Sequence, residues 1–142
     1  MKIAIGNDHG GLQLADACRD WLNENNIYVI DCGTNTADSV HYPVYAKKVV
    51  EEILQARADF GILVCGTGIG ISIAANKWPD IRCGLCSDIT TARLTRQHND
   101  ANILAMGGRI IGIEVGLDIV KTFVNTEFEG GRHAERIKLI ER

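Results

Sequence analysis

A cysteine followed by a glycine-rich turn has the clearest chemical potential in this sequence. Cys65 ends an apolar run and is followed by Gly66-Thr67-Gly68-Ile69-Gly70. Where such a turn joins a strand to a helix, its free N–H groups form an anion site at the helix N-terminus. The same N–H groups favour a thiolate, so Cys65 could serve as a base or a nucleophile beside a bound oxyanion. A plain tight turn is the alternative, because neither the dinucleotide fingerprint nor a Walker A pattern is present.

Polar residues also follow the first and the fifth expected strands. Asp8 and His9 come directly after the first strand and precede two glycines, which allow close approach of the backbone. Asp8 could simply cap a helix, or the pair could face a ligand. Arg109 follows two glycines after the fifth strand. Ligands of parallel α/β sheets bind beyond the carboxyl ends of the strands, so these residues are candidates for one site.

Basic residues near two expected helix ends could serve the same site. His98, followed by Asn99, lies at a helix C-terminus, where the helix dipole favours protonated histidine. A C-cap without a catalytic role is the alternative. Arg132 and Arg136 are four residues apart, so a helix would place them on one face that suits phosphate or carboxylate. Ion pairs with neighbouring glutamates on a solvated surface are the alternative for these arginines.

The remaining cysteines indicate neither a disulfide framework nor a metal site. Five cysteines are an odd number in a chain with no sign of export. Cys83 and Cys86 form a C-x-x-C pattern inside an expected strand, where residues three apart point to opposite faces. A redox pair or a zinc site needs both sulfurs on one side. We therefore expect no redox pair and no zinc site at these cysteines, and the expectation for the whole chain is likewise no metal and no cofactor.

Short apolar runs alternate with helical patterns along the chain. Strands are expected at 2–6, 27–32, 60–65, 82–86 and 103–107, and helices at 12–22, 45–53, 90–98, 115–124 and 132–140. Nearly continuous apolar strands are typical of a parallel sheet that helices cover on both faces. The alternation predicts one α/β domain over 1–142. Its fold is expected to be a three-layer α/β/α, Rossmann-like arrangement with a five-stranded parallel sheet.

The composition argues against several classes of partner. With a net charge of −3, the chain has no basic field for nucleic acid. Its apolar runs fall short of the roughly 18 residues that a membrane span requires. No signal-peptide pattern precedes the first expected strand. We expect a cytoplasmic protein without nucleic-acid or membrane partners.

Four motifs in register give the chain a resemblance to a known family. They are Asp8-His9-Gly10-Gly11, Cys65-Gly66-Thr67-Gly68-Ile69-Gly70, His98-Asn99-Asp100-Ala101-Asn102 and Asn125-Thr126-Glu127-Phe128-Glu129-Gly130-Gly131-Arg132-His133. In order and spacing they resemble ribose-5-phosphate isomerase B along essentially the whole chain. The resemblance implies a homodimer, or a dimer of dimers, whose active sites are built from two subunits. It also implies that the C-terminal helix reaches the partner subunit.

The activity implied by the resemblance is that of a metal-free aldose–ketose isomerase of the pentose phosphate pathway. Ribose 5-phosphate and ribulose 5-phosphate would interconvert through a cis-enediolate. Cys65 would carry the proton between C2 and C1, His98 would help to open the ring, and Asp8 would hold sugar oxygens. Thr67 and the N–H groups of residues 66–70 would stabilise the enediolate. The other contacts to the substrate would come from His9, Asn99, Arg109, Arg132 and Arg136.

Two departures from the family pattern bear on these roles. Some members use a glutamate shortly after the glycine turn, but Ile73-Ala74-Ala75-Asn76 contains no carboxylate, which favours Cys65 as the base. Relatives often carry an acidic residue where this chain has His41, so the roles of His41 and Tyr42 stay open. The galactose-6-phosphate isomerase subunits lack this cysteine and turn. An isomerase of allose 6-phosphate or another hexose 6-phosphate is the alternative, and a non-catalytic phosphate-binding module is a third possibility.

Overall fold

Five parallel strands form a single sheet in a computed structural model, which describes residues 1–141. The strands are β1 (Lys2–Asn7), β2 (Tyr28–Asp31), β3 (Phe60–Cys65), β4 (Cys83–Leu85) and β5 (Ile103–Gly107). Their order across the sheet is β2-β1-β3-β5-β4. The chain therefore moves outward from β1 to β2 and then returns to the other side of β1. Ligands of such sheets bind at the carboxyl edge where the strand order reverses, which here lies between β1 and β3.

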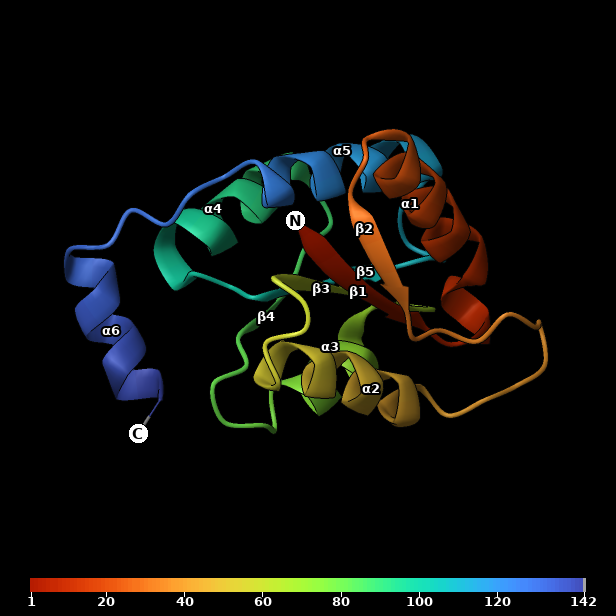
Figure 1. The fold of residues 1–142 in the computed structure, drawn as a ribbon, viewed down its shortest axis with the longest axis horizontal. Coiled ribbons are helices and arrows are strands. Elements are labelled where there is room, and N and C mark those ends of the chain that lie inside the picture. Colours follow the sequence, from red (N-terminus) through yellow and green to blue (C-terminus); the bar gives the residue numbers. More distant parts are fainter. Residues whose placement is uncertain (142) are drawn as a thin grey trace.

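Helices cover both faces of the sheet, which gives the expected three layers (Figure 1). Three helices pack on one face: α1 (Leu12–Glu24), α4 (Ile89–Asn99) and α5 (Ile113–Val124). Two pack on the other: α2 (Tyr42–Leu54) and α3 (Ile69–Ala75). A short 3-10 helix, η1 (His9–Gly11), leads into α1. Residues 1–141 contain no helix with the length and apolar character needed to cross a bilayer.

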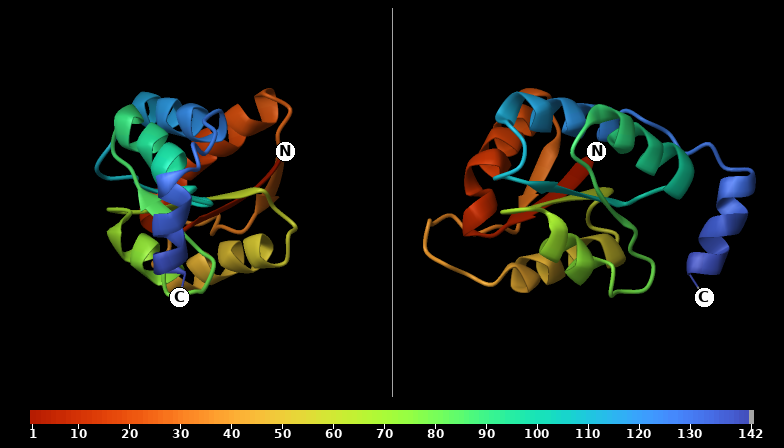
Figure 2. Two further views of the ribbon diagram at one scale, coloured as in Figure 1. Left: turned by 90° about the vertical axis from the view of Figure 1, so that its left-hand side faces the viewer. Right: turned by 180° about the vertical axis from the view of Figure 1, so that it is seen from behind.

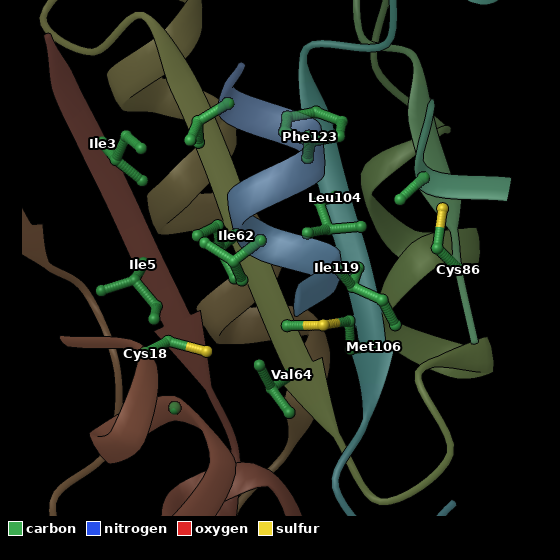
Figure 3. Close-up of a cluster of buried hydrophobic side chains, with 14 of the residues drawn as sticks. Ile3, Ile5, Cys18, Ile62, Val64, Cys86, Leu104, Met106, Ile119 and Phe123 are labelled. Atoms are coloured by element: carbon green, nitrogen blue, oxygen red, sulfur yellow. The ribbon is translucent and has the colours of Figure 1, made fainter. Parts of the chain in front are cut away.

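Alternate residues of each central strand fill two separate cores. Figure 3 shows the core beside α5, where Ile62 of β3 and Leu104 of β5 lie near Phe123, and all three are fully buried. The next residue along β3, Leu63, belongs to the opposite core with Val49 of α2. Burying a side chain of this size contributes about 1.5–3 kcal/mol. Burial on both sides explains why these strands are apolar at nearly every position.

The helix α6 (Arg132–Ile140) stands apart from the three layers. Figure 1 and the right view of Figure 2 place it beyond the end of α4, at the side of the molecule opposite the segment 32–41. Its apolar residues Leu139 and Ile140 are 73% and 62% exposed. The expected helix at 132–140 is confirmed. That it reaches a partner subunit stays a prediction.

Most expected elements lie within one or two residues of their observed bounds. The bounds of β3, β5 and α6 agree with the expectation, whereas β2 and β4 are each one residue shorter at both ends. Cys83 packs against one core and Cys86 lies in the other, so the predicted opposite orientation of the C-x-x-C pair is confirmed. Burial raises the pKa of Cys86 to about 11 and raises that of Cys83 as well. A raised pKa keeps both thiols protonated near neutral pH.

Candidate functional site

Three strand ends meet at the carboxyl edge of the sheet with main chain lying against main chain. The N–H of Gly108 donates to the carbonyl of Cys65 at 2.8 Å, and that of Asp8 donates to the carbonyl of Val64 at 3.2 Å. A Cβ atom at Gly108 would lie 2.7 Å from the carbonyl oxygen of Gly10. A side chain at that position would force the loops apart. Glycine thus allows the residues after β1, β3 and β5 to share one site.

The Cys65 side chain is held by the turn that follows it. Its Sγ atom accepts a hydrogen bond from the N–H of Gly68 at 3.1 Å, and the residue is only 4% exposed. Gly68 has a φ of +78°, and a Cβ there would lie 2.6 Å from Leu85 and 2.7 Å from the main chain of Met106. That N–H could remain on the sulfur when the thiol loses its proton. The geometry therefore suits a thiol that gives and takes a proton.

The second side chain of the turn is also engaged by the main chain. The Oγ1 atom of Thr67 accepts from the N–H of Ile69 at 3.1 Å. The family resemblance implies that N–H groups of residues 66–70 stabilise a substrate oxyanion. In this structure Cys65 and Thr67 already take those of Gly68 and Ile69. A bound oxyanion must replace these two side chains as acceptors or use the other N–H groups of the turn.

Asp8 and His9 both make contacts that fix their orientation. Asp8 is 6% exposed, and its Oδ1 accepts from the N–H of Gly11 at 3.1 Å, so the predicted capping role is confirmed for η1. The bond engages one carboxylate oxygen. The Nδ1 atom of His9 accepts from the N–H of Val40 at 3.2 Å, which places the proton of the neutral ring on Nε2. His9 can then donate to a ligand through Nε2.

A cavity of about 400 Å³ brings His9 and Arg109 together. Its volume lies within the range of small-molecule sites. The lining residues come from the ends of β1 and β5, from α1 and from the segment before α2, and they are His9, Gly10, Leu12, Gln13, Leu14, Ala37, Gly108 and Arg109. The Arg109 side chain also reaches the turn, because a Cβ at Gly66 would lie 3.3 Å from its Nη1 atom. One guanidinium therefore connects the cavity with the glycine turn.

Tyr42 is a member of this site whose role could not be read from the sequence. It is the first residue of α2, and its ring packs on Gly70. A Cβ atom at Gly70 would lie 2.6 Å from Cζ of Tyr42 and 2.8 Å from its hydroxyl oxygen. The only local signal is Pro43, the second residue of α2, which favours a helix start at this point. The contact itself joins residues 28 positions apart and is a property of the folded chain.

The structure places the other four candidate residues at the opposite edge of the sheet. α4 runs back from the end of β4 to the start of β5, so His98 and Asn99 lie near the amino ends of these strands. In agreement, Asn99 lies beside Arg82, the residue just before β4, because Nε of Arg82 donates to the carbonyl of Asn99 at 2.9 Å. The length of β5, at about 3.3 Å per residue, separates them from Cys65. Exposed Arg132 and Arg136 lie on α6 beyond this edge.

His98 stacks on a buried histidine of α6. The ring centroids of His98 and His133 are 4.3 Å apart, and the ring planes differ by 14°. His133 is 5% exposed, and its Nε2 lies 3.6 Å from Oε2 of Glu129. Burial lowers the pKa of His133, with further contributions from the positive charges of His98 and Arg132. The stack thereby ties the end of α4 to α6.

Comparison with known proteins finds relatives that match nearly the whole chain, including both edges of the sheet. A model of the Ribose/Galactose Isomerase family matches residues 3–140. Ribose-5-phosphate isomerase B of Escherichia coli is 45% identical over 139 residues, which cover 98% of this chain and 93% of that protein. A solved structure of ribose-5-phosphate isomerase B from Clostridium thermocellum is 50% identical, with a TM-score of 0.98 over 99% of this chain and 95% of that one.

A second solved structure, a ribose 5-phosphate isomerase from Thermotoga maritima, is 52% identical to the chain. It superimposes with a TM-score of 0.97 over 99% of this chain and 97% of that chain. Similarity of this kind includes the strand ends and α6. The loops that carry the candidate residues are therefore part of the shared architecture.

Proposed function

Because this chain belongs to the Ribose/Galactose Isomerase family, we propose that it interconverts ribose 5-phosphate and ribulose 5-phosphate. The relatives described above carry the name of this activity, and the chain aligns with nearly their whole lengths. The observation that carries the proposal is the nearly buried Cys65 thiol, which accepts a hydrogen bond from Gly68 where the strand order reverses. A cytoplasmic location stays a prediction.

In the proposed reaction, Cys65 is the proton carrier. Its thiolate takes the proton from C2 of the open-chain aldose, and the electron pair of that bond forms the C1–C2 double bond. The former carbonyl electrons move to O1, which becomes the oxyanion of a cis-enediolate. A proton passes from O2 to O1, the C2 carbonyl forms, and the thiol returns its proton to C1. N–H groups of the glycine turn and Thr67 stabilise the oxyanion, as donors placed where charge develops.

Ring opening precedes this step and needs a second acid or base. His98 is suited to it, because histidine changes its protonation near neutral pH. Asp8 would hold the sugar oxygens and Asn99 would contact the open chain. The phosphate would lie between His9, Arg109, Arg132 and Arg136. Binding energy from the phosphate, which does not react, holds C1 and C2 in place.

The proposed site requires two chains. Cys65 and His98 lie at opposite edges of one sheet, so a single chain cannot present both to one sugar. An isologous dimer can bring α6 and the end of α4 of one chain to the carboxyl edge of the other. The separation of α6 from the three layers supports this arrangement (Figure 2).

The test is a panel of pentose and hexose phosphates incubated with the protein in D₂O. Ribose 5-phosphate should give ribulose 5-phosphate, with deuterium at C2 of the recovered aldose. Faster turnover of allose 6-phosphate would favour the hexose alternative. Binding of all the sugar phosphates without turnover or exchange would favour a non-catalytic phosphate-binding protein and would contradict the proposal.

A further inference from the structure

Three side chains with metal-binding atoms converge at the amino edge of the sheet. His98 comes from α4, Glu129 from the segment between α5 and α6, and His133 from α6. One ligand atom from each lies within 4.8 Å of the other two. Two histidines and one carboxylate are a donor set that binds zinc with one position left open. The cluster is therefore a candidate for a divalent transition-metal ion.

An unpartnered buried atom points to a missing ligand at this place. Nε2 of His133 is buried and has no hydrogen-bond partner among residues 1–141. The nearest carboxylate oxygen, Oε2 of Glu129, is 3.6 Å away, which is too long for a hydrogen bond. Buried polar atoms in folded proteins nearly always have a partner. A cation between Nε2 and Oε2 would serve both atoms.

The separation of these two atoms suits zinc. Ligands bound at 2.0–2.2 Å around a tetrahedral Zn²⁺ lie about 3.4 Å apart. The observed distance of 3.6 Å between Nε2 of His133 and Oε2 of Glu129 needs almost no change. Glu129 is exposed, so an ion can enter from solvent along its carboxylate.

The third ligand requires a rotation of His98. Its ring is stacked on His133, so the nitrogen lone pairs of the two rings lie in nearly parallel planes. The ring must turn for a nitrogen to face the ion. His98 is half-buried and its ring makes no hydrogen bond within residues 1–141, so the rotation breaks only the stack. Nearby Arg132 and Arg136 repel a cation, which favours a reversible site over a permanent one.

We propose that His98, Glu129 and His133 form an inhibitory site for a Zn²⁺-like divalent cation. The bound ion takes the nitrogen lone pair that His98 uses in ring opening, so occupancy reduces turnover. The inhibition rests on the function proposed above, whereas binding of the ion does not. The ion is no cofactor, and the reaction proceeds without it.

Binding is tested on the full chain after treatment with EDTA and removal of the chelator, by calorimetry with Zn²⁺ and by visible absorption with Co²⁺. Cobalt bound by nitrogen and oxygen lacks the strong charge-transfer absorption of a cobalt thiolate. We expect one ion per chain, and Glu129→Gln should weaken binding at least about tenfold. Glu135→Gln is the matched control, because it removes the same charge from an exposed position of α6. Equal weakening by both substitutions would overturn the site, since only the net charge would then matter.

Two further variants separate this site from others. Cys65→Ala should bind the ion as the unaltered chain does, and loss of binding there would move the ion to the thiol and overturn the proposal. His133→Gln should also lose binding while the circular dichroism of the protein is retained. In activity assays, Zn²⁺ should inhibit turnover, EDTA should reverse the inhibition, and Glu129→Gln should need at least tenfold more ion. If the chain turns over no sugar phosphate, the isomerase proposal fails while the cobalt titration still decides the metal site.

Discussion

The N–H of Gly68 donates a hydrogen bond to the Sγ atom of Cys65 at 3.1 Å, and Gly68 does so in a left-handed conformation. The φ of +78° turns its N–H back toward the end of β3 while the chain continues into α3. The orientation of the thiol and the start of the helix therefore depend on the same residue. A substitution there should affect activity and stability together.

Gly68→Ala should lower the free energy of unfolding by at least about 1–2 kcal/mol, the cost of a left-handed conformation for a residue with a Cβ. Close contacts of the added methyl group with Leu85 and the main chain of Met106 add to this cost. The kcat should fall as well. Gly112→Ala is the control, because an added Cβ there meets nothing within 4 Å. Urea unfolding and steady-state kinetics measure both effects, and an unchanged Gly68→Ala variant would contradict the role of the turn.

Cys65→Ala should reduce kcat by about 10²–10⁴-fold, the usual contribution of a general base, while binding of inorganic phosphate is largely spared. Cys32→Ala should leave kcat unchanged. Cys32 is a half-buried thiol whose pKa is raised to about 11, chiefly by burial and also by Glu52 and Asp31. Turnover is followed by the appearance of the ketose. A Cys65→Ala variant as active as the Cys32→Ala variant would refute proton transfer by this thiol.

Mixing Arg136→Ala chains with Cys65→Ala chains should restore activity that neither variant has alone. If each site takes Cys65 from one chain and Arg136 from its partner, a mixed dimer contains one intact site. Random pairing of equal amounts should then give about a quarter of the unmodified activity. Native mass spectrometry verifies that mixed dimers form. Confirmed mixed dimers without activity would argue that each site is built from one chain.

The stability of the protein should decrease as the pH falls below the ordinary pKa of histidine, about 6.5. Burial lowers the pKa of His133 in the folded chain, so below 6.5 the unfolded chain binds more protons than the folded chain. The contribution of neutral His133 to the free energy of unfolding is present above pH 6.5 and is lost as the pH falls toward the lowered pKa. Urea unfolding with EDTA present, between pH 5.5 and 7.5, measures it. His133→Gln should flatten this dependence, and an identical slope in the variant would assign it to other groups.

The sequence predicted those parts of the fold that follow from local pattern. The apolar runs of β3 and β5 identify strands that are buried on both faces, and Asp88, just before the expected helix 90–98, is of a residue type that caps helices. The side-chain oxygen of Asp88 accepts from the N–H of Thr91, as a cap should. The opposite orientation of Cys83 and Cys86 followed from strand geometry alone.

The sequence could not predict contacts that only the tertiary arrangement creates. The packing of Tyr42 on Gly70 joins the start of α2 to the turn after β3. The stack of His98 on His133 depends on the path between α5 and α6. Burial along α1 is a further example, because Leu14 is buried while Arg19 pairs with Asp16 and Asp31.

The contact between the main chains of Gly10 and Gly108 affects how the protein can evolve. At the carboxyl edge of the sheet the loops after β1 and β5 pack through glycine main chain, so a larger residue at Gly108 would separate them. The segment 34–41 is different, because it contributes Ala37 to the lining of the cavity and the N–H of Val40 to His9. Substitutions in that segment can therefore reshape the cavity while the packed glycine edge stays unchanged.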